Sequence, residues 1–257
     1  MGTKKTDSGS VKTTETVFSV LETLHSIEGG RVTEVANEMG MAKSTIHRHL
    51  STLESEGYVI REGDTFEISL RFLALGEYAR TRKEAYRKIR PKVKQLAVET
   101  NESAQFLVAE QDKAVYLYRE RGSDAVNTPN SRIGERIPLH ATAAGKAILA
   151  CYPREKVETI IDDIGLSALT EKSITDEETL YDQIGEIQDR GYSLNQEENV
   201  DGIHAVGVPI KRTNGSPIGA LSVSGPAHRL QGETFEQELP DLLLETANQL
   251  ELNIAYP

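Results

Sequence analysis

A tight turn at Gly40–Met41, between two helical patterns, constrains the start of this chain more than any other feature. In the 42–56 stretch after the turn, Ile46, Leu50 and Leu53 fall on one face of a helix. This apolar face must pack against neighbouring helices. A shorter helical pattern leads into the turn from the other side. Two short helices joined by a tight turn that contains Gly are typical of a helix-turn-helix.

The flanking segments extend this motif. A first helix, capped by Thr13 or Thr14, is expected to end at Gly29–Gly30. Two β-like stretches, 58–61 and 65–69, flank a turn that contains Gly, which indicates a hairpin. The order helix, helix, turn, helix, hairpin predicts a winged helix-turn-helix.

The polar face of the 42–56 helix suits a DNA groove. Its only carboxylates, Glu54 and Glu56, lie at the C-terminal end, and a helix in the major groove contacts bases mainly with its N-terminal half. Arg48 is the best candidate for a base contact, because its guanidinium can donate two hydrogen bonds to O6 and N7 of guanine. A plain solvated helix face is the alternative interpretation. The residues predicted to bind DNA are Lys43, Ser44, Thr45, His47, Arg48, Ser51 and, near the wing, Arg61.

The charge of the chain is unevenly distributed. The net charge is −11. Residues 1–82 carry ten Lys and Arg against twelve Asp and Glu, a net of −2, whereas residues 83–257 carry 19 against 28, a net of −9. DNA affinity would therefore depend on a few placed cations. An acidic chain without Trp is compatible with a haloarchaeal source and equally with many ordinary cytoplasmic proteins.

Several classes of protein and site are not expected. No run approaches the roughly 18–20 apolar residues of a membrane span, and the polar start lacks the apolar core of a secretory signal, so a cytoplasmic location is expected. Cys151 is the single cysteine, and we interpret it as a buried, inert thiol. His47 and His49 would point about 200° apart on a helix and cannot share an ion. We expect no metal and no cofactor.

Residues 70–99 are expected to join two domains, because the pattern there is helical and highly charged and Pro91 interrupts it. We predict four parts: a disordered tail over 1–10, a winged helix-turn-helix domain over 11–70, a linker helix over 71–90 and a second domain over 91–257.

Strands near both ends of the second domain, with helices between them, predict an α+β fold around one antiparallel sheet. Paired strands are expected over 104–110 and 114–120. Asn214–Gly215 is the strongest short hairpin signal in the chain. The Thr175–Glu178 stretch is a capping-box pattern, and a small-residue helix is expected over 142–151.

Small and hydroxylated side chains gather on the last strands. Ala220, Ser222 and Ser224 share one face of a strand, and Ile203 and Ala205 share a face of its partner. Such a row leaves volume above a sheet and supplies hydroxyl donors, as a cavity for a small polar ligand requires. The alternative is that small residues only let a helix pack closely.

A helix that begins with Ala143, Ala144 and Gly145 would expose backbone N–H groups, which attract an anion together with the helix dipole. A carboxylate that rests there with its tail over the sheet is our hypothesis. The Gly145–Lys146 pair does not belong to a phosphate-binding P-loop, because His140 stands where that motif needs its first Gly.

Three ordered motifs give the chain a recognisable character: AKSTIHRHLSTLESEGYV, then IPLHATAAGKAILA, then GYSLNQEENVDGIHAVGVPI followed by GALSVSGP. With these motifs the chain resembles the IclR family of bacterial and archaeal regulators over nearly its full length. The resemblance implies a homodimer or homotetramer, a GAF-like α/β effector domain and a response to small organic acids or aromatics. The family contains both repressors and activators.

The same resemblance indicates the residues that contact an effector. Two of them depart from the family pattern, since Asn195 stands where relatives often carry Asp, and Ala205 where some carry Cys. Both departures alter the polarity of the expected pocket. The positions that match the family's effector contacts are Val126, Ile137, Ala143, Ala144, Asn195, Ile203, Ala205, Ser222 and Ser224.

The leading functional hypothesis is a sequence-specific transcriptional regulator whose affinity for double-stranded operator DNA changes with a small organic effector, a carboxylate or an aromatic acid. A DNA-binding scaffold without any ligand is one alternative. An enzyme on the second domain is another, and it would have to use some of the candidate side chains, which form no familiar nucleophile–base motif. These candidates are Cys151, His140, His204, Glu197 and Glu198.

Overall fold

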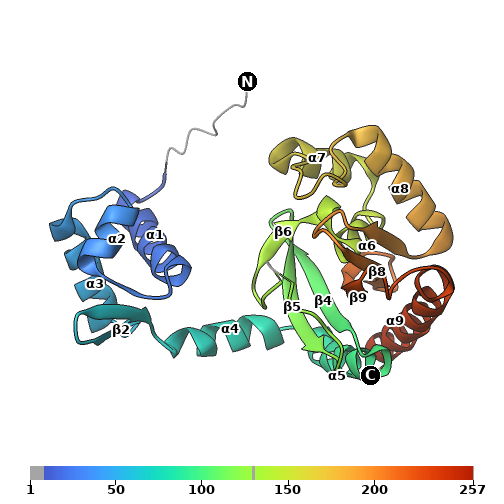
Figure 1. The fold of residues 1–257 in the computed structure, drawn as a ribbon, viewed down its shortest axis with the longest axis horizontal. Coiled ribbons are helices and arrows are strands. Elements are labelled where there is room, and N and C mark those ends of the chain that lie inside the picture. Colours follow the sequence, from blue (N-terminus) through green and yellow to red (C-terminus); the bar gives the residue numbers. More distant parts are fainter. Residues whose placement is uncertain (1–8, 129–130, 257) are drawn as a thin grey trace. The chain divides into compact units, whose positions relative to one another are not determined.

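The computed structural model describes residues 9–128 and 131–256. Its internal contacts divide the chain into two compact units between Arg82 and Lys83. Figure 1 shows the helices and strands of both units.

The first unit is a winged helix-turn-helix. Its helices are α1 (Lys12–Ser26), α2 (Val32–Glu38), α3 (Lys43–Ser55) and α4 (Arg71–Thr81), and its strands are β1 (Gly30–Arg31), β2 (Val59–Glu62) and β3 (Thr65–Ile68). The three strands form an antiparallel sheet in the order β1-β3-β2. The predicted order of elements is confirmed; the two-residue strand β1 is too short to show a periodic pattern.

The turn between α2 and α3 depends on a glycine. Gly40 has φ +61°, a left-handed conformation that glycine adopts without a steric penalty. The chain then returns at once, and the Met41 N–H donates to Ala36 O at 3.0 Å. At the first helix the prediction was wrong in detail, because Val11 occupies the N-cap position and Thr13 and Thr14 lie inside α1.

The core of the first unit lies where α1, α2 and α3 meet the small sheet. Ile46, Leu50 and Leu53 are buried, as the helical spacing predicts. They pack with side chains from α1, α2 and the two wing strands: Val20, Leu24, Val35, Ala36, Val59 and Phe66.

The break between the two units lies at Arg82–Lys83, where α4 ends and α5 (Glu84–Thr100) begins. The expectation that Pro91 breaks the helix was wrong, since this exposed proline lies within α5. Tyr86 and Ile89 of α5 are buried in the core of the second unit. The stretch before Pro91 is therefore not part of a free linker helix.

The second unit is built on a six-stranded antiparallel sheet in the order β6-β5-β4-β9-β8-β7. Its strands are β4 (Ser103–Glu110), β5 (Lys113–Arg121), β6 (Arg136–Pro138), β7 (Ser193–Gln196), β8 (Ile203–Lys211) and β9 (Pro217–Pro226). Its remaining helical elements are η1 (Leu139–Ala141), α6 (Ala143–Leu149), α7 (Arg154–Ile164), α8 (Glu177–Arg190), η2 (Thr234–Glu238) and α9 (Leu239–Ala255).

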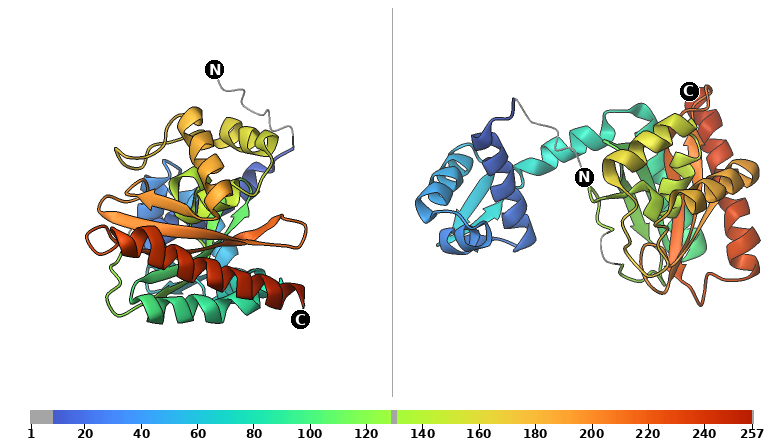
Figure 2. Two further views of the ribbon diagram at one scale, coloured as in Figure 1. Left: turned by 90° about the vertical axis from the view of Figure 1, so that its right-hand side faces the viewer. Right: turned by 90° about the horizontal axis from the view of Figure 1, so that it is seen from above.

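Helices cover both faces of this sheet. Helices α5 and α9 lie side by side on one face (Figure 2, left), over a core that includes Phe106, Val206 and Leu221. Helix α6 packs on the opposite face, and its core cluster also takes in apolar residues of α7 and α8. Two apolar layers therefore enclose one sheet, as an α+β fold requires.

Local signals account for several of these elements. The Asn214–Gly215 turn joins β8 to β9, with Gly215 at φ +82°, so the hairpin prediction is confirmed. Helix α8 is capped one residue later than expected, because the Asp176 carboxylate, rather than the Thr175 hydroxyl, accepts the N–H of Thr179 at 2.9 Å.

Candidate DNA-reading surface and effector cavity

The outer face of α3 is open to solvent. Ser44, His47 and Arg48 are exposed, on the side turned away from the buried Ile46 and Leu50. Within residues 9–128 and 131–256, no side chain forms a hydrogen bond or ion pair with the Arg48 guanidinium. The other predicted DNA contacts on α3 share this availability: Lys43 is exposed, and Thr45 and Ser51 are partly exposed.

On the wing, the Arg61 side chain is held in place. Its Nε donates to Gly63 O at 2.9 Å, a guanidinium nitrogen lies 3.6 Å from Asp64 Oδ1, and its Cζ lies 5.4 Å from the centre of the Phe66 ring. These contacts fix a cation beside α3 and leave it exposed. The exposed carboxylate of Asp64 in the same turn weakens the electrostatic attraction between Arg61 and a phosphate.

A hollow of about 310 Å³ lies between the wing, α3 and the start of α2. Arg31, His47 and Arg61 contribute cationic or titratable side chains to its wall. Arg31 was not among the predicted DNA contacts, because it precedes the helical pattern and carries no distinctive spacing. Its position beside two predicted DNA contacts makes it a further candidate for a phosphate contact.

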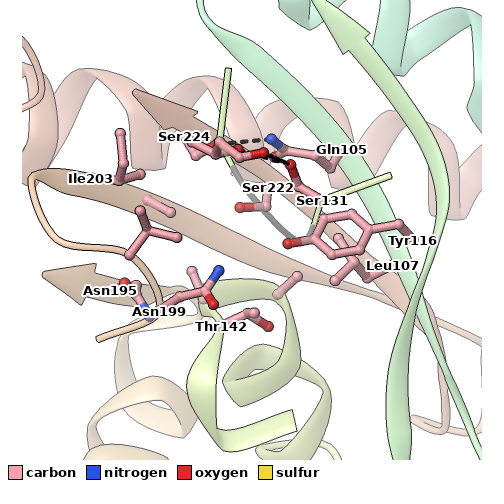
Figure 3. Close-up of a pocket in the computed structure, with 15 residues that line it drawn as sticks. Gln105, Leu107, Tyr116, Ser131, Thr142, Asn195, Asn199, Ile203, Ser222 and Ser224 are labelled. Atoms are coloured by element: carbon pink, nitrogen blue, oxygen red, sulfur yellow. Dashed lines mark hydrogen bonds between the residues drawn. The ribbon is translucent and has the colours of Figure 1, made fainter. Parts of the chain in front are cut away.

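The second unit contains a small cavity above the sheet (Figure 3). Its volume is about 40 Å³. It lies between strands β4, β5, β7, β8 and β9, the start of α6, and two connecting segments. The lining residues are Gln105, Leu107, Tyr116, Thr128, Ser131, Thr142, Ala143, Ala144, Asn195, Asn199, Val200, Ile203, Ala205, Ser222 and Ser224.

The structure brings together seven of the nine expected effector positions: Ala143, Ala144, Asn195, Ile203, Ala205, Ser222 and Ser224. It does not bring in the other two. Ile137 pairs with Ala114 across β5 and β6 and is buried in the apolar cluster beside α6. Val126 lies in the connection after β5, outside the cavity wall.

Eight wall residues were not predicted. Gln105 could have been found, because it alternates with the core residues Ala104 and Phe106 along a strand that was expected. Asn199 and Val200 carry no such signal, since they lie in the irregular segment between β7 and β8. Their place in the wall is set by tertiary contacts.

Polar groups line the cavity, and several are already satisfied. The Asn195 amide donates to Ala141 O at 2.9 Å and its oxygen accepts the Glu198 N–H at 3.2 Å. Gln105 donates to Ser224 Oγ at 2.8 Å (Figure 3). Burial raises the pKa of Tyr116 to about 12, so its hydroxyl stays protonated. A ligand therefore meets hydroxyls and amides rather than charges.

A cation lies directly behind this wall. The Arg119 guanidinium donates to Ser131 O and to Thr128 Oγ1, each at 3.0 Å, and its buried Nε has no partner within the described part of the chain. Burial lowers the pKa of Arg119, and the neighbouring Tyr116 offsets part of that shift. No carboxylate forms an ion pair with it among the residues described.

The small residues of α6 have a packing role. A Cβ on Gly145 would lie 2.0 Å from Leu139 O, and one on Gly207 would lie 2.5 Å from the Ala143 carbonyl carbon. Close approach of α6 to the η1 turn therefore requires glycine at 145, and close approach of α6 to the sheet requires glycine at 207. The Thr142 hydroxyl already accepts the Gly145 N–H at 2.9 Å, which removes that N–H from the proposed anion site.

The side chains considered for catalysis are engaged elsewhere. Burial raises the pKa of the Cys151 thiol to about 11, which opposes formation of a nucleophilic thiolate. His140 Nε2 lies 3.1 Å from Ser167 O, and His204 Nδ1 lies 2.7 Å from Leu230 O. The two imidazoles thus serve different backbone segments. Among the described residues, no group of three His, Cys, Asp or Glu side chains could hold a metal ion.

In the part of the chain that the structure describes, no helix is long and apolar enough to cross a membrane.

Two family models together match most of the chain. The IclR helix-turn-helix domain matches residues 14–63, and the bacterial transcriptional regulator IclR C-terminal domain matches residues 79–252. Among curated proteins, the probable HTH-type transcriptional regulator ArcR of Halobacterium salinarum is 31% identical over 99% of both chains. The HTH-type transcriptional regulator KdgR of Escherichia coli is 29% identical over 96% of this chain and 94% of its own.

Solved structures show the same architecture. The IclR protein of Thermotoga maritima superimposes with a TM-score of 0.81 at 27% identity, covering 95% of this chain and 99% of its own. An IclR homologue of Microbacterium hydrocarbonoxydans, solved in complex with 4-hydroxybenzoate, has a TM-score of 0.77 at 23% identity and covers 94% of this chain and 98% of its own. At that identity the second likeness concerns the fold.

Proposed function

Because the chain belongs to the IclR family of transcriptional regulators, we propose that α3 binds operator DNA and that a short carboxylic acid in the second-unit cavity changes this binding. The acid-free, solvent-exposed face of α3 supports the first part. The polar cavity beside Arg119 supports the second, and this observation carries the proposal.

The size of the cavity favours a short acid over an aromatic one. Pockets for drug-sized ligands measure about 300–1,000 Å³, whereas this cavity measures about 40 Å³. A cavity of this size takes only a small acid without a large rearrangement of its wall. An aromatic acid, such as the 4-hydroxybenzoate bound to the Microbacterium homologue, would need the wall to open.

The charge of Arg119 favours an anion. An incompletely paired cation that is partly removed from water is destabilising, and an anion placed near it restores favourable interactions. Thr128 and Ser131, which receive its two hydrogen bonds, both line the cavity. A carboxylate bound there would interact with the guanidinium through the wall or after a small rotation of Thr128.

Calorimetric titration of the full chain tests this proposal. We expect acetate, glycolate, pyruvate or malonate to bind, and the corresponding neutral amides and 4-hydroxybenzoate to bind at least tenfold more weakly. Arg119→Met should weaken carboxylate binding at least tenfold without weakening the amide, and Arg119→Lys should retain much of the carboxylate affinity. Absence of binding by all four acids, with no thermal shift, would favour the ligand-independent scaffold.

We further propose that the protein acts in the cytoplasm as a homo-oligomer. Within the first unit α4 has no buried residue, and the apolar side chains at its start and along it are largely exposed: Leu70 by 79%, Leu73 by 68%, Leu75 by 53% and Tyr78 by 73%. So many exposed apolar side chains in one short segment are unusual in a monomer. A second copy of this unit would cover them and would present two α3 helices to two half-sites.

A further inference from the structure

A cation and a carboxylate are buried together at the edge of the cavity. Lys146 of α6 is fully buried, and its Nζ lies 2.7 Å and 2.5 Å from the two carboxylate oxygens of Glu198. Gln183 Oε1 of α8 accepts a third hydrogen bond from this Nζ at 2.6 Å. Burial lowers the pKa of Lys146, and the Glu198 carboxylate opposes that shift.

Stability alone is a poor reason for such a pair. Removing two charges from water costs about as much as their attraction returns, and well-packed apolar residues of similar volume often serve equally well. The partners of a buried pair, in contrast, fix two segments in one register, because any other arrangement leaves a charge without compensation.

The two segments joined here both form the cavity wall. Lys146 lies one helical turn after Ala143, which lines the cavity, and Glu198 directly precedes Asn199 and Val200, which also line it. The pair is therefore the direct link between the start of α6 and the 197–202 segment that connects β7 to β8. No other charged side chain within the described residues joins these two segments.

The backbone of the 197–202 segment needs this support. Glu197 has φ +70°, a conformation that a residue with a Cβ adopts only when its surroundings hold it there. Ser173 Oγ donates to Glu198 O at 2.7 Å, and Asn195 Oδ1 accepts the Glu198 N–H at 3.2 Å. These two hydrogen bonds hold the backbone at the start of the segment. The buried side chain of Glu198 fixes how closely the segment approaches the core.

We propose that the Lys146–Glu198 pair positions the 197–202 segment against the cavity, so that Asn199 and Val200 meet the effector in one fixed arrangement. Lys146 and Glu198 are positioning residues in this account, since neither lines the cavity itself. The expected effect of the pair on ligand affinity rests on the proposed function of the cavity. The expected effect on the position of the 197–202 segment does not.

Amide hydrogen exchange of the full chain tests the positioning directly. Lys146→Met with Glu198→Met removes both charges and leaves no unpaired ion, so the variant keeps a folded core. We expect the amides of 199–202 to exchange at least tenfold faster, while the amides of β4 exchange as in the wild type. Lys172→Met is the matched control, because it removes the ion pair of an exposed lysine with the partly exposed Glu197 in the same segment and should leave these rates nearly unchanged.

The affinity for whichever of acetate, glycolate, pyruvate or malonate binds the wild type supplies the second measurement. The double variant should bind it at least tenfold more weakly, and Lys172→Met should bind it with less than a twofold change. Unchanged exchange over 199–202, or equally faster exchange in β4, overturns the inference. If the wild type binds none of the four acids, the proposed effector class fails, and the exchange rates still decide whether the pair positions the segment.

Discussion

Arg48 is the side chain through which this protein most directly reads DNA in our account. Its guanidinium is exposed on α3 and engaged by no other described residue. A bidentate contact from such a group to guanine contributes about 1–3 kcal/mol of discrimination against the wrong base.

Arg48→Ala should therefore abolish sequence-specific footprints at fixed salt, while calorimetric binding of the effector stays unchanged. Lys94→Ala removes an equal charge from an exposed site on α5 of the second unit and serves as the control. A footprint that survives in Arg48→Ala would mean that another element reads the bases.

Substitutions of Ser222 test whether the effector binds in the cavity. It is 5% exposed, and its side chain lines the cavity (Figure 3). Ser222→Leu should fill a volume of this size and abolish the effector response, with a loss of stability of about 1–3 kcal/mol from overpacking. Ser222→Ala, which removes only the hydroxyl, should keep part of the response. A full response in Ser222→Leu would place the effector elsewhere.

The buried ion pair also makes a residue-scale prediction about stability. Lys146→Met leaves the Glu198 carboxylate buried without its cation, and breaking one partner of such a pair typically costs about 3–5 kcal/mol. Urea unfolding of this single variant should show a loss of that order, and the Lys146→Met, Glu198→Met double variant should lose less. Equal losses in the two variants would show that Glu198 gains no stability from Lys146.

At the scale of elements, the contact between α6 and the preceding η1 turn is the tightest constraint on the cavity. A Cβ on Gly145 would lie 2.0 Å from a backbone oxygen, which cannot move without displacing η1. Gly145→Ala should therefore destabilise the protein by about 1–3 kcal/mol or more and weaken effector binding.

Gly185→Ala is the matched control for this substitution. Gly185 lies inside α8, and a Cβ there would meet nothing within 4 Å. This change should stabilise the protein by about 0.5–1 kcal/mol, because alanine favours a helix over glycine. Thermal unfolding monitored by circular dichroism compares the two, and a tolerated Gly145→Ala would contradict the packing described for α6.

Elements with a long periodic pattern could be predicted from the sequence. Ile46, Leu50 and Leu53 indicated α3, and Asn214–Gly215 indicated the β8–β9 hairpin. The short strands β6 and β7, of three and four residues, carry too little pattern to be found. Helix α7 was not predicted, although Val157, Ile160 and Ile161 recur at helical spacing and are buried.

The cavity could be predicted in part for a related reason. Alternation along β9 placed Ser222 and Ser224 on one face, and both line the cavity. Arg119 could not be placed in this way, because the pairing of β4 with β5 shifts register between Phe106 and Leu107, so the alternation along β5 is interrupted. Asn199 depends on the buried Glu198 beside it, whose partner Lys146 is distant in sequence.

At the scale of the whole molecule, the exposed apolar side chains of the α4 region bear on the oligomeric state of the protein. The exposed apolar side chains of Leu70, Leu73, Leu75 and Tyr78 predict that full-length protein is at least a dimer in solution. Leu73→Asp should shift sedimentation toward the monomer, because it replaces one of these side chains by a charge, whereas Ala79→Asp adds the same charge about 120° around the helix from Leu73 and should shift it less. A wild-type protein that sediments as a monomer at micromolar concentration would remove the basis for two α3 helices on one operator.

The charge of the chain is divided unequally between the two units. The second unit holds most of the acidic excess, and the winged helix-turn-helix is nearly neutral. We therefore expect DNA binding to depend on a few cations on and near α3 rather than on a broad basic surface. Consequently, we expect the DNA affinity to depend only weakly on salt. A modest change in DNA affinity caused by the effector would then be enough to control binding.

A DNA-binding titration measures whether a short carboxylate in the cavity changes operator affinity. An operator selected from random duplexes is titrated with full-length protein at fixed salt, with and without a saturating concentration of the tightest-binding acid. We expect the midpoint to shift by about 5–150-fold, which corresponds to a coupling of about 1–3 kcal/mol, and we expect no shift in Ser222→Leu. Identical midpoints with and without every acid that binds would contradict this expectation.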